Sequence, residues 1–119
     1  METAEVTNEL GKIRISDHVI AVNARNAALK VPGIAGMGES IFHSFSSVIS
    51  DDITEGVHVG IKENTAVIDL YVCVRYGDRI PAIALRLQEA VKESIADYLG
   101  VKTSAVNVNV SEIIFDKEK

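Results

Sequence analysis

Three histidines and one cysteine are the side chains in this sequence best suited to hold a metal or to attack a substrate. His18, His43 and His58 are far apart, and none has another histidine or a cysteine at metal-ligand spacing. Cys73 lies within the run Ile68–Val74, where a thiol usually packs as a small hydrophobic group. The sequence therefore predicts no catalytic residue, no metal ligand and no bound cofactor, and we expect the protein not to be an enzyme.

The segment from residue 75 to residue 81 is better suited to binding than to catalysis. Arg75, Tyr76, Asp78 and Arg79 lie where a strand passes into a helix. Arginines can hold a carboxylate, and a helix N-terminus offers unpaired N–H groups to the same ligand. We expect a small docking site here. The alternative, in which both arginines pair with nearby acids, is left open by the sequence.

Two phenylalanines form a second candidate for contact with a partner. Phe42 and Phe45 recur at helical spacing within the serine-rich segment 39–53, which predicts a short, mobile amphipathic helix. The two rings either cover the edge of the core or form a patch that a partner protein contacts. The sequence does not distinguish these roles.

The centre of the chain predicts a β-hairpin, because apolar and polar residues alternate over 57–62 and again over 66–75. A third alternating run covers residues 106–111. In a sheet with one buried face, this period places a set of polar and aromatic residues together on the other face. These residues are His58, Asp69, Tyr71, Asn107 and Asn109. We expect that face to be uncovered and able to bind.

Two helices are predicted beside these strands. Ser16 is a good N-cap for a helix over 17–30, and Pro32-Gly33 would end it. Asp78 is expected to cap a second helix, which has an apolar stripe along one side and ends at Gly100. Residues 1–10 carry acids without a base and are expected to form a flexible acidic tail, while residues 116–119 form a charged end.

These elements predict an α+β two-layer sandwich, with two long helices on one face of a mixed four- to five-stranded sheet. The expected order is β-α-β-(α)-β-β-α-β, and a single domain is expected over residues 11–115. A chain of 119 residues can bury a core of its own without disulfides or metal.

Composition narrows the classes of partner. The formal net charge of −5 supplies no basic field for nucleic acid or anionic lipid. One cysteine excludes an internal disulfide, and no long apolar run or secretory leader is visible. We therefore expect a cytoplasmic protein that neither binds nucleic acid nor inserts directly into a membrane.

Several blocks of sequence, taken in order and spacing, resemble the bacterial alkaline-shock or envelope-stress-response family, found mainly in Gram-positive organisms. The similarity spans about residues 10–115. The blocks are GKIRIS (11–16), VPGIAGM (31–37), EGVHV (55–59), IDLYV (68–72), Tyr76-Gly77 with Ile80-Pro81, and VNVNV (106–110). The serine-rich segment Ser40–Asp52 departs from the family pattern.

The resemblance implies a small cytoplasmic protein without known catalysis, linked to cell-envelope homeostasis under stress. It also implies a protein partner, which for some members is anchored in the membrane and keeps them close to it; homo-oligomerisation is left open. The alternative is a small-ligand carrier, or an accessory subunit of an enzyme, with a pocket near residues 75–81. An apolar cavity would favour the carrier, and a continuous exposed patch would favour the interaction module.

Overall fold

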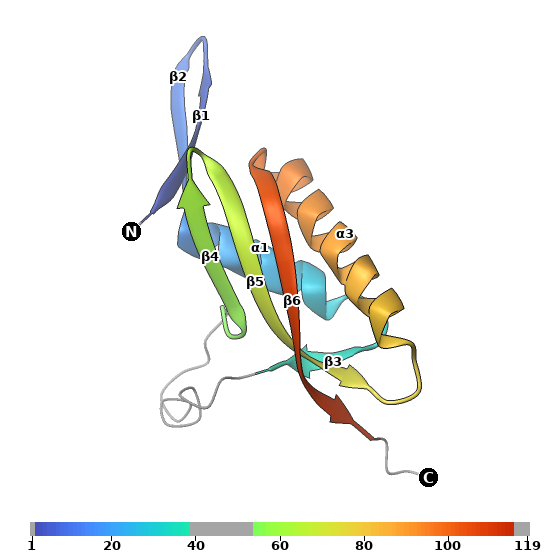
Figure 1. Cartoon of the computed structure of the whole chain (residues 1–119). Helices are drawn as coiled ribbons and strands as arrows, with labels where there is room; N and C mark the ends of the chain where they lie inside the picture. The colour runs from blue at the N-terminus through green and yellow to red at the C-terminus, as the bar shows by residue number, and fades with distance from the viewer. Residues whose placement is uncertain (1, 39–53, 116–119) are drawn as a thin grey trace.

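The computed structural model describes residues 2–38 and 54–115 of the 119-residue chain. Two helices and six strands follow one another in these residues (Figure 1). In chain order they are β1 (Thr3–Asn8), β2 (Gly11–Ser16), α1 (Asp17–Leu29), β3 (Ile34–Met37), β4 (Val57–Lys62), β5 (Thr65–Arg75), α3 (Ile80–Leu99) and β6 (Lys102–Ile114). The predicted segment 39–53 lies outside the described residues.

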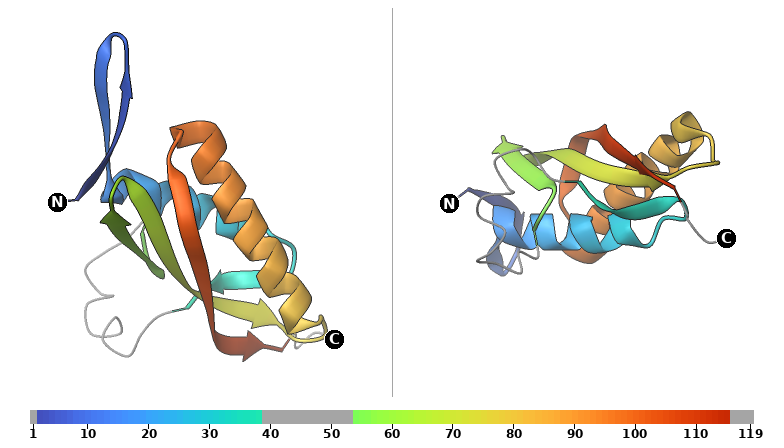
Figure 2. Two further views of the ribbon diagram at one scale, coloured as in Figure 1. Left: turned by 45° about the horizontal axis from the view of Figure 1, so that its top comes forward. Right: turned by 90° about the horizontal axis from the view of Figure 1, so that it is seen from below.

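The main sheet has four strands and is built around β5. One edge of β5 pairs antiparallel with β4 and, further along, with β3, while the other edge pairs parallel with β6. Both helices lie on one face of this sheet (Figure 2). The predicted α+β architecture and mixed sheet are therefore confirmed. The structure adds a separate two-stranded sheet made by β1 and β2.

The core lies between the sheet and the two helices. Alternate side chains of β5 point into it, and each is at most 1% exposed: Ala66, Ile68, Leu70, Val72 and Val74. From α3 the buried stripe is Ile83, Leu87, Val91 and Ile95, and α1 contributes Ile20, Ala21, Ala24 and Ala28. Small alanines on α1 let that helix approach the sheet closely. Neither of the helices in residues 2–38 and 54–115 covers the opposite face of the sheet.

The ends of the helices follow local chemistry with one exception. Ser16 caps α1 as expected, since its side-chain oxygen accepts from the Val19 N–H at 3.2 Å. Gly100 ends α3 in the left-handed conformation, with φ at 71°. The prediction that Asp78 caps α3 is wrong. The N-cap is Arg79, which makes no side-chain capping bond; its backbone carbonyl accepts from Ala82 and Ile83.

The predicted flexible tail is also corrected, because residues Thr3–Asn8 form β1 and pair along their length with β2. Ala4 is only 1% exposed. The acids have distant partners: Glu2 accepts from the Ile61 N–H at 3.0 Å, and Glu5 lies 3.0 Å from Arg14 Nε. The absence of a base within residues 1–10 therefore did not make the segment loose, because pairing with β2 and these side-chain partners hold it.

Candidate interaction surface on the open face of the sheet

The face of the sheet opposite the helices, called here the open face, carries the predicted polar and aromatic residues. His58 of β4 and Asn107 and Asn109 of β6 are exposed, while Asp69 and Tyr71 of β5 are half-buried. They come together because successive side chains of a strand point to opposite faces. The buried neighbours Ile68, Leu70 and Val72 fix which face that is. The expected grouping of these five side chains on one face is thus seen in the structure.

The register of the strands places the five residues on neighbouring positions and brings two pairs of them into contact. On β5, Asp69 is opposite His58 on one side and opposite Asn107 on the other. Asn107 Nδ2 donates to Asp69 Oδ1 at 2.8 Å. The rings of His58 and Tyr71 meet edge to face, with centroids 5.8 Å apart. These contacts hold donors, acceptors and an aromatic ring in a defined arrangement.

The backbone also contributes to the order of this face. Asn109 Nδ2 donates to the Leu70 carbonyl at 3.1 Å, which ties the side chain to β5. Tyr71 is bonded through its N–H to the Gly56 carbonyl at 2.8 Å and through its own carbonyl to the Gly38 N–H at 2.6 Å. The backbone of Tyr71 therefore bonds both to Gly38, just after β3, and to Gly56, just before β4. A surface whose side chains are already restrained loses little conformational freedom when a partner binds.

The structure shows no assembled reaction centre among the residues it describes. No group of three or more His, Cys, Asp or Glu side chains lies close enough to hold a metal in residues 2–38 and 54–115. Cys73 is half-buried, and its Sγ lies 4.0 Å from the Met37 carbonyl oxygen. What the open face offers chemically is hydrogen bonding and aromatic contact.

The predicted docking site at the start of α3 is exposed. Arg75, Tyr76, Asp78 and Arg79 are all on the surface. The Tyr76 ring, 67% exposed, lies 4.7 Å from the Phe115 ring, which is 62% exposed. In the part of the chain that the structure describes, neither arginine lies within ion-pair distance of an acid. The alternative of local pairing therefore finds no support there.

The two predicted clusters are linked by a single strand. Asp69 and Arg75 are both on β5 and are separated by an even number of residues, so the pleat directs both toward the open face. Six residues of strand correspond to about 20 Å. Phe42 and Phe45, the other predicted contact residues, lie outside the described part of the chain.

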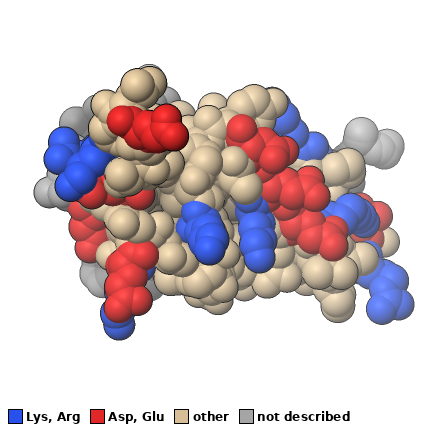
Figure 3. All heavy atoms as spheres, turned by 90° about the horizontal axis from the view of Figure 1, so that it is seen from above, with Lys and Arg blue, Asp and Glu red and all other residues tan. Residues whose placement is uncertain are grey.

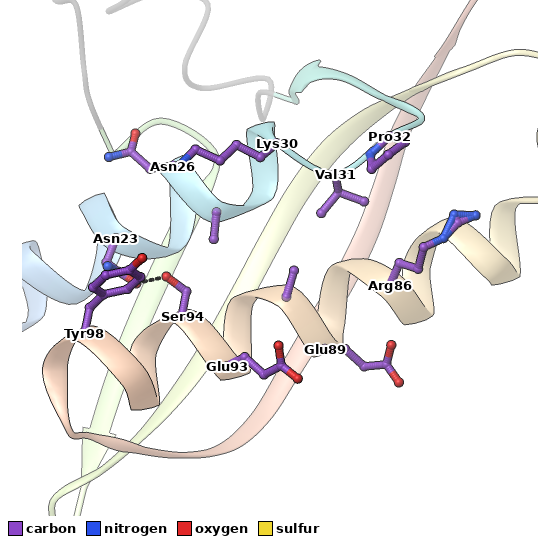
Figure 4. A pocket seen from close by; sticks show the side chains of 12 residues that line it. Asn23, Asn26, Lys30, Val31, Pro32, Arg86, Glu89, Glu93, Ser94 and Tyr98 are labelled. Atoms are coloured by element: carbon purple, nitrogen blue, oxygen red, sulfur yellow. Dashed lines mark hydrogen bonds between the residues drawn. The ribbon is translucent and has the colours of Figure 1, made fainter.

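A groove between the two helices was not predicted. Its volume is about 670 Å³, and it is lined by residues of α1 and α3 and by residues 30–32, which follow α1. Figure 4 shows Asn23 and Tyr98 at one end and Pro32 and Arg86 at the other. Ser94 Oγ donates to Asn23 Oδ1 at 2.8 Å across it. The helix crossing creates this groove, and neither helix alone carries a signal for it.

The surface charge is mixed. On the face seen in Figure 3, acidic and uncharged groups divide the basic side chains into small groups. This distribution agrees with the net charge of −5 and offers no continuous basic field on that face. No helix among the described residues is both long and apolar enough to cross a membrane.

The fold and the site define a small two-layer α+β domain, with helices on one face of the sheet and a hydrogen-bonding surface on the other. The sequence of residues 5–115 matches the alkaline shock protein 23 family, whose description is a cell envelope-related function. The chain belongs to this family. The resemblance inferred from the sequence blocks is thereby confirmed, as is the association with the cell envelope.

Similar proteins support the assignment. The uncharacterized protein Spy1535 of Streptococcus pyogenes is 30% identical over 93% of this chain and 85% of its own length. The uncharacterized protein YloU of Bacillus subtilis is 30% identical over 92% of this chain and 93% of its own length. Among solved structures, MamM-CTD 215–293 matches 82% of this chain and 99% of its own chain with a TM-score of 0.50 and 14% identity. That likeness shows the fold alone.

Proposed function

We propose that this protein is a non-catalytic interaction module of cell-envelope or alkaline-stress homeostasis, and that its open face binds a partner protein. The observation that carries the proposal is the arrangement of His58, Asp69, Tyr71 and Asn107 on the face of the sheet that neither described helix covers. Membership of a cell envelope-related family supports the cellular role.

The shape of the surface favours a protein over a small molecule. Small ligands are usually bound in concave cavities that bury most of their surface. The polar residues of the open face instead extend across three neighbouring strands. The helix groove of about 670 Å³ lies on the other layer and does not include residues 75–81. No specific observation therefore favours the carrier with a pocket at that junction.

Arg75 and Arg79 indicate the charge of the partner. Both are exposed and form no ion pair with an acid among the residues described, in a chain whose net charge is −5. An acidic segment that contacts Tyr71 and Asp69 through polar and aromatic groups would reach these arginines after about 20 Å. We expect the protein to be cytoplasmic and to be kept near the membrane by a partner anchored there.

Site-specific photo-crosslinking in the native host tests the proposal. Benzoylphenylalanine replaces Tyr71 or His58 on the open face, and the matched control replaces Glu89, which is exposed on the helix layer. We expect a defined protein adduct from the two open-face positions and none from Glu89. Equal adducts from all three positions, or an adduct from Glu89 alone, would contradict the proposal.

The recovered partner allows a second measurement. If Arg79 pairs with an acid of the partner and the pair is desolvated, Arg79→Ala weakens binding by about 2 kcal/mol, roughly thirtyfold. Its denaturation midpoint should stay close to that of the wild type, because the exposed side chain makes no capping bond. Calorimetric titration that gives equal affinities would remove Arg79 from the site.

A further inference from the structure

One edge of β6 has no strand partner among residues 2–38 and 54–115. The strand partner of β6 among the described residues is β5, on one side. On the other side, Gln88 Nε2 from α3 donates to the Val106 carbonyl at 2.9 Å, so this carbonyl points away from β5. Alternate residues of a strand direct their N–H and C=O groups to the same edge. Val108 and Val110 therefore present these groups to the open edge.

The sequence along this edge reads the same in both directions about Val108. Residues 106–110 are Val-Asn-Val-Asn-Val, and the nine residues 103–111 carry no charge. Antiparallel strands pair residues that lie on the same face of the sheet. If two copies of β6 meet about a twofold axis at Val108, Val106 is opposite Val110 and Asn107 is opposite Asn109. Valines then meet valines on the core face, and asparagines meet asparagines on the open face.

Apolar side chains flank the same edge and remain exposed. Val110 is 37% exposed and Ile113 42%. Leu85 of α3 is 55% exposed and lies one turn from Gln88, on the side of the helix that overhangs β6. Long, uncharged edge strands with exposed apolar residues readily pair with another strand, and proteins usually protect them with charges or prolines. Here residues 103–111 contain neither a charge nor a proline.

We infer that β6 binds β6 of a second copy of this chain, antiparallel and about a twofold axis at Val108. The two four-stranded sheets then form one continuous sheet, with α3 of each copy beside the axis. A second copy fits better than an unrelated peptide, because the pairing is self-complementary on both faces of the sheet. The paired residues 106–110 also carry no charge, so the net charge of −5 does not oppose their contact. The Val106 carbonyl has two lone pairs, so it can accept from Gln88 and from Val110 of the second copy.

The inference predicts a dimer whose formation depends on this edge. Sedimentation equilibrium of the full chain between about 1 and 500 μM, a range that covers ordinary dissociation constants, should show a monomer–dimer equilibrium. Val110→Lys and Leu85→Glu should each weaken dimerisation about tenfold or more, since a charge would face an apolar partner. Leu85 is exposed, so its variant also tests the edge without risk to folding. The matched control Ile13→Lys changes an exposed strand residue of β2 and should dimerise like the wild type.

Disulfide trapping tests the register. In a Cys73→Ser background, Val108→Cys should form a disulfide-linked dimer, because a hydrogen-bonded pair at the axis has Cα atoms about 5.5 Å apart. Val110→Cys should not, since its two copies would be at least about 13 Å apart. A wild-type protein that stays monomeric, charged variants that dimerise unchanged, or equal trapping at both positions would overturn the inference. Photo-crosslinking from the open face does not depend on this edge, so the partner proposal can fail or succeed separately.

Discussion

Replacing Asn107 by aspartate should turn an attractive contact at the centre of the open face into a repulsive one. In the wild type, Asn107 Nδ2 donates to Asp69 Oδ1 at 2.8 Å. Asn107→Asp keeps the size and shape of the side chain but replaces the donor with a carboxylate that faces another carboxylate. Asn107→Ala removes the donor without adding a charge, so the two variants separate the hydrogen bond from the repulsion.

The magnitude follows from the exposure of the pair. A typical lost hydrogen bond costs about 0.5–1.5 kcal/mol of unfolding free energy, and we expect this range for a bond to a carboxylate that water can reach. Two unit charges 4 Å apart repel by about 1 kcal/mol in bulk water and about 4 kcal/mol at the effective dielectric of a protein surface. Asn107 is exposed and Asp69 is half-buried, so we expect the lower part of that range. Asn107→Ala should therefore cost about 1 kcal/mol and Asn107→Asp about 2–3 kcal/mol at pH 7.

The loss of unfolding free energy caused by Asn107→Asp, called here its deficit, should also depend on pH. Two adjacent carboxylates share a proton, so the folded variant binds that proton more tightly than the unfolded chain does. Stability rises as pH falls wherever the folded state binds more protons. Urea denaturation from pH 7 to about pH 4, near the ordinary range of carboxyl groups, should show the deficit shrinking toward that of Asn107→Ala. Added salt should shrink it at pH 7.

The reasoning would be refuted if Asn107→Asp were as stable as Asn107→Ala at pH 7, or if its deficit stayed constant over the whole pH range. Either result would mean that the two side chains do not face each other across β5 and β6. The assignment of Asp69 and Asn107 to one arranged surface would then be withdrawn.

Two further predictions concern the turns that position the strands. Asn64 has φ at 61°, and its side chain accepts from the Glu5 N–H at 3.0 Å. Asn64→Gly should lose only that bond, which costs about 0.5–1.5 kcal/mol of unfolding free energy. Asn64→Ala should cost about 1–2 kcal/mol more, because alanine is strained in this left-handed conformation. Urea denaturation compares them, and equal costs would contradict this account. Gly56→Ala should be more damaging, since at φ 80° its Cβ would lie 2.9 Å from both Met37 Cβ and the Tyr71 carbonyl oxygen. A thermal midpoint unchanged from the wild type would show that Gly56 is not packed as tightly against Met37 and Tyr71 as described.

The sequence predicted which residues make up the candidate site, but not the contacts between them. Period-two alternation places His58, Asp69 and Tyr71 on one face of a hairpin, and alternation over 106–111 does the same for Asn107. Alternation carries no information on which strands are neighbours. The bond between Asp69 and Asn107 requires β6 to lie parallel to β5 in one register, although the two residues are 38 positions apart.

The sequence alone determined the elements whose signals are local. The cap at Ser16, the left-handed end of α3 at Gly100 and the apolar stripe of α3 depend on residues within a few positions of one another. The cap of α3 was misjudged because Asp78 and Arg79 are neighbours, and the geometry of the junction, which also involves the distant Gly33, decides between them.

Tertiary structure decided how the first residues are held and which edge of the sheet stays open. β1 pairs with the neighbouring β2, and contacts of Glu2 and Glu5 with the β4–β5 hairpin, 59 positions away, hold these strands against the domain. The open edge of β6 likewise exists because, among the described strands, only β5 pairs with β6, on one side, while Gln88 bonds one carbonyl on the other. Backbone groups must be paired or solvated, but a local pattern does not show which distant segment pairs them. That choice depends on how the helices and strands pack around one core.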